Sequence, residues 1–199
     1  MEFLPKMRRV LDLYDTRPPD GRVICVDEFG PLNLMPGKGR AWRPAGRPVR
    51  QRATYTRTQG VRHMLASLDL ATSGMTYRIR TRKRWPQFLD ILKLKMLRRR
   101  RPGERLYLVM DNYGPHKRPE VPAWCADNIE LVFLPTNASR LNWIECEFTA
   151  LRYFALDGTG HRGHTEQNTA VGDYVRWRNT RAQPKRHFAI NSPIRHPIT

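Results

Sequence analysis

Two short apolar runs, far apart in the chain, each end in an aspartate. The first is residues 23–27 (VICVD) and the second is residues 106–111 (LYLVMD). Apolar runs of about four to eight residues are typical of strands buried inside a sheet. If these two strands pair, Asp27 and Asp111 lie together at one edge of the sheet. The chain is therefore expected to fold around a sheet that presents two acids at one point.

The rest of the chain alternates between strand-like and helix-like patterns. Strand-like segments are residues 22–28, 53–60, 61–70, 76–80, 106–111 and 129–134. Helix-like periodicity is found at residues 3–14, 85 to about 98–101, 119–126, 140–154 and 166–179. Short connections between the opening strands favour an antiparallel meander, whereas strands separated by helices should add in parallel. The pattern predicts an α/β fold in which three antiparallel strands are followed by two parallel ones.

The length of 199 residues suits one domain with a sizeable core. We expect an N-terminal helix and linker at residues 1–21, the main domain at residues 22–180, and a basic tail at residues 181–199 that could be loose. Within the main domain, residues 30–60 are rich in Gly, Pro and Arg, which predicts an exposed basic arm.

The chain is strongly basic. Its 36 Lys and Arg against 18 Asp and Glu give a formal net charge of +18, and residues 1–105 hold 25 of the basic side chains but only 9 of the acids. Such a field attracts polyanions, and arginine suits phosphate because its planar fork bonds two oxygens at once. A surface that served only solubility would mix both signs. The composition therefore indicates a nucleic acid as partner.

Two basic segments are candidates for that contact. The basic arm has no acid between Glu28 and Asp69 and interleaves its cations with Trp42 and Tyr55, which suits phosphate contact and base stacking. The alternative is a basic loop without a defined partner. The cations of the arm are Lys38, Arg40, Arg43, Arg47, Arg50, Arg52 and Arg57. A second patch, at the entry to the helix that begins near residue 85, includes Lys83 and Arg84.

Nothing in the sequence indicates export or membrane insertion. Cys25, Cys125 and Cys146 are odd in number and widely separated, which is typical of reduced thiols in a cytoplasmic protein. No apolar run is long enough to span a bilayer, and no secretory signal follows Met1. We expect a cytoplasmic protein without a membrane partner.

Two carboxylates held close together repel one another, so a cation is expected between them. Oxygen ligands select hard ions such as Mg²⁺ or Mn²⁺. A third acid on a nearby helix would complete a two-metal site that activates water and stabilises a leaving oxygen. Glu145 and Glu147 lie on the last long helix but about 200° apart around its axis, so only one can face the site. Helix geometry alone does not choose between them.

Three blocks of sequence resemble the motifs of a known family. They are VDEFG (residues 26–30), MDNYGPHK (residues 110–117) and LPTNASRLNWIE (residues 134–145). They look like those of bacterial insertion-sequence transposases in the mariner-like branch of the DDE superfamily of endonucleases. In that family the third block ends in Asn-x-Ile-Glu, and its glutamate is a metal ligand. Here that glutamate is Glu145, and the 33 residues between Asp111 and Glu145 fit the family's interval.

The resemblance implies a ribonuclease-H-like fold with a mixed five-stranded sheet flanked by helices. It also implies that Asp27, Asp111 and Glu145 hold two Mg²⁺ or Mn²⁺ ions, cut one strand of DNA and join the freed end to target DNA. Asn112 and His116 follow the second acid in the family block and would support the site. The implied partners are double-stranded DNA, as transposon ends and target, and a second subunit in a homodimer. The implied location is the bacterial nucleoid.

The family's N-terminal helix-turn-helix part has no counterpart in this sequence, which leaves two alternatives open. A helix-turn-helix subunit could be encoded separately. Otherwise the chain could be a catalytically silent remnant that only binds DNA or a partner protein. A different nuclease on the same fold is disfavoured by the Asn-x-Ile-Glu block.

Several side chains near the acids allow more than one interpretation. Glu28 should point to the strand face opposite Asp27, where it would support the site or face solvent. His116 could orient a phosphate or a metal-bound water, or could be a structural residue of a turn. His161 and His164 resemble a metal-binding pair only superficially, and we interpret them as loop residues.

Overall fold

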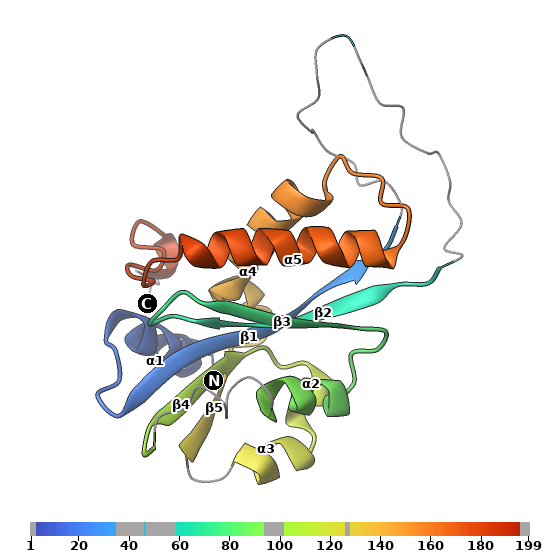
Figure 1. Ribbon diagram of the computed structural model, residues 1–199. Coiled ribbons are helices and arrows are strands. Elements are labelled where there is room, and N and C mark those ends of the chain that lie inside the picture. The colour runs from blue at the N-terminus through green and yellow to red at the C-terminus, as the bar shows by residue number, and fades with distance from the viewer. Residues whose placement is uncertain (1–2, 35–45, 47–58, 94–101, 126–127, 196–199) are drawn as a thin grey trace.

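The structure is a computed structural model that describes residues 3–34, 46, 59–93, 102–125 and 128–195 (Figure 1). Its strands are β1 (Gly21–Leu32), β2 (Arg62–Asp69), β3 (Met75–Arg80), β4 (Arg105–Met110) and β5 (Ile129–Phe133). Its α-helices are α1 (Phe3–Asp15), α2 (Trp85–Ile91), α3 (Glu120–Cys125), α4 (Ile144–Leu151) and α5 (His164–Thr180). Its 3-10 turns are η3 (Gly114–Lys117), η5 (Ser139–Leu141) and η7 (Pro193–Arg195), and a π-helical turn, η6 (Arg152–Leu156), continues α4.

The five strands form one sheet in the order β3-β2-β1-β4-β5. β1 pairs with β2 and β2 with β3 in antiparallel fashion, whereas β1 with β4 and β4 with β5 are parallel. The prediction of three antiparallel strands followed by two parallel ones is confirmed.

The register of β1 and β4 brings their terminal acids to the same level. Cys25 of β1 is the Cα partner of Val109 of β4. Asp27 and Asp111 each lie two residues further along, so they occupy equivalent positions on adjacent parallel strands. Two local patterns that the sequence places 84 residues apart are therefore joined by the pairing of their strands.

Two apolar cores cover the two faces of the sheet. α1, α4 and α5 pack on one face, and α2 and α3 pack on the other (Figure 1). Along β1, Cys25 belongs to the first core and Val26 to the second. By the two-residue alternation of a strand, Asp27 faces the side of α4, and Glu28 faces the side of α2.

Both ends of the described chain pack against the sheet. Met7 and Val10 of α1 are fully buried in the same core as the sheet, so residues 3–15 are part of that packed unit. In the tail, the Phe188 ring lies 4.9 Å from the rings of both Tyr14 and Trp143. The expectation of a loose tail is wrong for residues 181–195, because aromatic contacts from distant elements hold it.

Some predicted segments lie outside the described residues. They include most of the strand expected at residues 53–60, the helix beyond residue 93, and all seven arm cations named above. In the part of the chain that is described, no helix is long and apolar enough to cross a membrane.

Candidate active site

Asp27 is buried near the middle of the sheet, where a charged carboxylate is costly. Its side chain accepts hydrogen bonds from the backbone N–H of Glu28 at 2.7 Å and from the amide of Asn142 at 3.1 Å. Burial and, after it, the negative charges of Asp111 and Glu145 raise the pKa of Asp27 to about 7. The charges of Asp111 and Glu145 therefore lie near enough to Asp27 to affect its pKa.

Asp111 is held in a different way. Its Oδ1 accepts hydrogen bonds from the backbone N–H of Tyr113 at 3.0 Å and from Nδ1 of His116 at 2.9 Å. Burial alone would raise the pKa of Asp111, but these two bonds and the positive charges of His116 and Lys83 lower it. Asp111 is therefore an ionised, oriented carboxylate.

His116 links the second acid to β1. The imidazole is fully buried, stacks against the Phe88 ring at 4.1 Å, and bonds Asp111 through one nitrogen and Glu28 through the other, at 2.8 Å. Although burial disfavours its charged form, the two carboxylates raise the pKa of His116 to about 9. Glu28 points to the face opposite Asp27, as predicted, and there it orients His116. The two side chains thus position Asp111.

Asn142 positions the side chain of Asp27 in a similar way. Its side chain is 1% exposed and donates to the carbonyl of Val26 at 3.0 Å as well as to Asp27. Its backbone carbonyl accepts a hydrogen bond from the N–H of Glu145 at 3.1 Å, in the first turn of α4. A single residue therefore connects the strand that carries the first acid to the helix that carries the third.

Glu145 and Glu147 lie on different sides of α4. Glu145 is half-buried, and burial followed by the charge of Asp111 raises its pKa. Glu147 is 7% exposed and accepts from Arg178 and Lys185, both at 2.7 Å. Glu147 is therefore not a surface acid but is buried in a network of ion pairs. Of the two glutamates, Glu145 is the one whose charge interacts with those of Asp27 and Asp111.

The donor set fits a hard divalent cation. It consists of three carboxylates, and a cation would relieve the repulsion that raises the pKa values of Asp27 and Glu145. Within the described ranges, no three His, Cys, Asp or Glu side chains are close enough to hold an ion as they stand. The Glu145 carboxylate makes no hydrogen bond or ion pair with another described residue, so it is the acid with freedom to adjust.

Three of the remaining predicted residues, one asparagine and two cations, have distinct positions. The amide of Asn112 donates to the carbonyl of Leu134, so it ties the end of β4 to the end of β5 and does not contact the acids. Lys83 lies 4.5 Å from the centre of the Tyr113 ring and is near enough to Asp111 to lower its pKa. Arg84 is exposed at the start of α2. Of the two, Lys83 is therefore the cation beside the acids.

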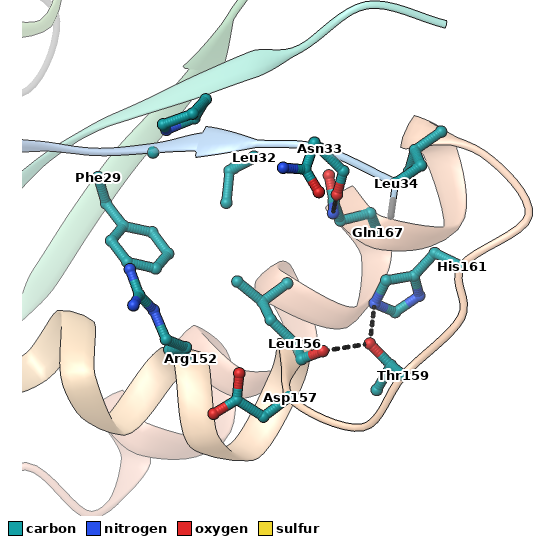
Figure 2. Close-up of a pocket in the computed structure, with 12 residues that line it drawn as sticks. Phe29, Leu32, Asn33, Leu34, Arg152, Leu156, Asp157, Thr159, His161 and Gln167 are labelled. Atoms are coloured by element: carbon teal, nitrogen blue, oxygen red, sulfur yellow. Dashed lines mark hydrogen bonds between the residues drawn. The ribbon is translucent and has the colours of Figure 1, made fainter. Parts of the chain in front are cut away.

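A cavity of about 530 Å³ lies between the end of β1, η6 and the start of α5 (Figure 2). Phe29, two residues beyond Asp27, and Arg152 line it, with the guanidinium 5.4 Å from the ring centre. The charge of Arg152 also opposes the rise in the pKa of Glu145. The cavity thus contains a cation whose charge is felt by the third acid.

The first turns of α5 hold both described ends of the basic arm. Gln167 donates to the carbonyl of Asn33 at 2.8 Å, and Figure 2 shows these two side by side. Nε2 of His164 bonds the carbonyls of Gln59 at 3.1 Å and Gly60 at 3.2 Å. His164 opens α5 rather than lying in a loop, and its role is to fasten the base of the arm.

The profile of the DDE superfamily endonucleases matches residues 22–162, which contain all three acids. The chain belongs to this family. A comparison with curated protein sequences finds no match.

Solved structures agree on the fold of this DDE superfamily endonuclease. The catalytic domain of Mos1 mariner transposase is similar with a TM-score of 0.59 and 14% identity, over 89% of this chain and 84% of that one. The Mos1 paired end complex with Mn is similar with a TM-score of 0.64 and 15% identity, over 89% of this chain and 56% of that one. An intasome of simian T-cell lymphotropic virus is similar with a TM-score of 0.52 and 10% identity, over 79% of this chain and 49% of that one. The chain therefore has the ribonuclease-H-like fold of these enzymes and spans about half the length of the full Mos1 chains.

The sequence alone does not identify Asn142 and Glu28 as residues that position the acids. Asn142 was noted only as part of the Asn-x-Ile-Glu signature, and Glu28 was left between a supporting and a surface role. A signal existed for Glu28, because an acid predicted to face the buried side of a strand needs a partner there. For Asn142 the signature itself was the signal.

Proposed function

We propose that this DDE superfamily endonuclease domain is the catalytic domain of a transposase, which cuts DNA and joins the freed end to target DNA. The observation that supports the proposal is the placement of two acids by strand pairing, with a third on a nearby helix. Asp27 and Asp111 lie at equivalent positions of adjacent parallel strands, and Glu145, in the first turn of α4, is near enough for its charge to affect the pKa of Asp27.

Asp27, Asp111 and Glu145 would hold two Mg²⁺ or Mn²⁺ ions. When bound, the ions supply activation of the attacking water or hydroxyl and stabilisation of the leaving oxygen. The chain's own residues do the rest. Asn142 fixes the Asp27 carboxylate, the Glu28–His116 pair fixes Asp111, and both arrangements exist before any substrate arrives.

DNA would reach the acids along basic surfaces. Lys83 stands beside Asp111 and would attract the phosphate next to the cut. The basic arm, whose ends are fastened to α5, would contact the duplex further away. We propose that the acting species is a homodimer on paired DNA ends, with recognition of the ends supplied by a helix-turn-helix unit, in the same chain or a separate one.

Nicking of a supercoiled plasmid tests the proposal. Wild-type protein should nick the plasmid in Mg²⁺ or Mn²⁺ and not in EDTA. Asp27→Asn, Asp111→Asn and Glu145→Gln should each abolish nicking while DNA binding is retained. Glu120→Gln, which neutralises a partly exposed carboxylate, should nick normally and serves as the matched control.

Three outcomes would contradict parts of the proposal. Undiminished nicking by any of the three acid variants would remove that acid from the site. DNA binding without nicking by the wild type would favour a catalytically silent protein. Nicking without joining of a free DNA end to the plasmid would favour a nuclease of another kind.

A further inference from the structure

Four aromatic side chains form one cluster on the outside of α5 and η6. They are Tyr153, Phe154, Tyr174 and Trp177, hereafter the aromatic platform. Phe154 lies between the others, with ring centroids 5.0 Å from Tyr153, 5.9 Å from Tyr174 and 6.3 Å from Trp177. Tyr153, Phe154 and Trp177 remain 55%, 64% and 49% exposed. Contiguous exposed aromatic surface of this kind marks a binding site.

A π-helical turn in the backbone directs two of these rings outward. α4 does not end in a regular turn but widens into the π-helical turn η6, which closes with a hydrogen bond from the N–H of Asp157 to the carbonyl of Arg152 at 2.8 Å. Within this turn Ala155 is buried, whereas Tyr153 and Phe154 face solvent beside α5. π-helical turns are rare and are found mostly at functional sites.

The charges around the platform favour a polyanion over a second copy of the chain. The guanidinium of Arg181 lies 4.9 Å from the centre of the Trp177 ring, and Arg176, paired with Asp173, is exposed on the same helix. A symmetric dimer through this face would bring these cations toward their own copies in a chain of net charge +18. Nucleic acid bases suit the platform instead, because stacking on aromatic rings beside arginine is how unpaired strands are bound.

The platform lies further along the helix that carries Glu145. Glu145 is in the first turn of α4, and Phe154 follows nine residues later on the same continuous helix. At 1.5 Å per residue the separation along the axis is about 13 Å. Nine residues also amount to about two and a half turns, so the two side chains point to different sides of the helix.

We propose that the aromatic platform is a stacking site for unpaired bases of the DNA that this domain binds. This inference rests on the proposed function, because it takes DNA to be the substrate. It adds a requirement that the acids do not impose: part of the bound DNA is unpaired, and its bases are held by Phe154 and Trp177.

The test compares two DNA probes without divalent metal, so that nothing is cut. One probe is a blunt duplex, and the other is the same duplex with a short single-stranded thymidine tail that carries the fluorescent base aminopurine. The full chain should bind the tailed probe more tightly and quench the aminopurine. Phe154→Ala with Trp177→Ala should reduce affinity for the tailed probe by about tenfold or more and abolish quenching. Affinity for the blunt probe should be unchanged.

Controls separate stacking from charge and from general damage. Phe3→Ala with Ile190→Ala removes exposed apolar side chains away from the platform and should leave both affinities unchanged. Equal affinity of the wild type for the two probes, or equal losses on both probes in the platform variant, would overturn the proposal. So would a dimer in sedimentation that dissociates on loss of Trp177, because the face would then be occupied by a second copy.

The outcome is separable from that of the proposed function. If the protein binds the single-stranded tail but never nicks DNA, the platform inference is supported and the proposed catalytic function is contradicted. If the protein nicks DNA but does not distinguish the tailed probe, the catalytic function is supported and the platform inference is contradicted.

Discussion

The side-chain amide of Asn142 donates a hydrogen bond to the carboxylate of Asp27 at 3.1 Å, and its second hydrogen reaches the carbonyl of Val26 at 3.0 Å. Both acceptors lie on β1, whereas Asn142 lies two residues before α4 begins at Ile144. The position of the first acid is therefore set from the segment that leads into the helix of the third. Replacing this one amide should disturb the site more than it disturbs the fold.

We predict that Asn142→Ala lowers the free energy of unfolding by about 1–3 kcal/mol, because it removes one hydrogen bond to the buried Val26 carbonyl and one to the buried Asp27 carboxylate. Nicking should fall by at least about tenfold, because the Asp27 carboxylate is no longer held. Asn179→Ala is the matched control, since Asn179 also bonds buried backbone, at Met75, but lies away from the acids. Chemical denaturation and plasmid nicking measure the two effects. Equal losses of nicking in both variants at equal stability would contradict a positioning role for Asn142.

Divalent cations should stabilise the folded protein. Mg²⁺ or Mn²⁺ at about 100 times its dissociation constant adds about 2.7 kcal/mol to the free energy of unfolding. For a chain of this size that corresponds to a rise in Tm of about 5–10 °C. The physical reason is that a cation would compensate a carboxylate whose pKa is raised to about 7 by burial and, after it, by the charges of Asp111 and Glu145. Thermal denaturation with Mg²⁺ and with EDTA measures the shift. The same shift in Asp111→Asn would place the cation elsewhere.

The Glu147 network gives a prediction for stability against pH. Burial opposes the charged form of Glu147, but hydrogen bonds from Arg178 and Lys185 lower its pKa below the ordinary value of 4.5. A lowered pKa contributes stability that is present above the ordinary value and lost as the pH falls through the folded value. Breaking such a buried pair costs about 3–5 kcal/mol.

We therefore expect Glu147→Gln to be destabilised by about 3–5 kcal/mol near neutral pH. The difference from the wild type should shrink as the pH falls below 4.5, because the wild type then loses the same charge. Urea denaturation across the acidic range measures it, with the partly exposed Glu120→Gln as control. A difference that stays constant with pH would mean that the charge of Glu147 contributes nothing.

How much the sequence could predict depends on how local each pattern is. The two strands ending in Asp27 and Asp111 are local, and their parallel pairing follows from the connections between them. The choice between Glu145 and Glu147 is not local. It depends on Arg178 and Lys185, which contact Glu147 only once α5 and the tail have packed. Helix geometry could therefore not identify the third acid, and the assignment to Glu145 came from the family signature. The same holds for the tail itself, whose Phe188 finds its aromatic partners only in the folded chain.

The basic arm provides the last prediction. Each phosphate neutralised by the protein contributes about 0.9 to the slope of log affinity against log salt concentration. Arg43→Ala, Arg47→Ala and Arg50→Ala together should therefore flatten that slope by up to about 2.7 if all three side chains contact phosphate. Arg8→Ala, Arg17→Ala and Arg118→Ala together remove the same charge from outside the arm and should change the slope less. Fluorescence anisotropy with a duplex over a range of salt concentrations measures both. Equal slopes for the two triple variants would mean that the arm acts only through net charge.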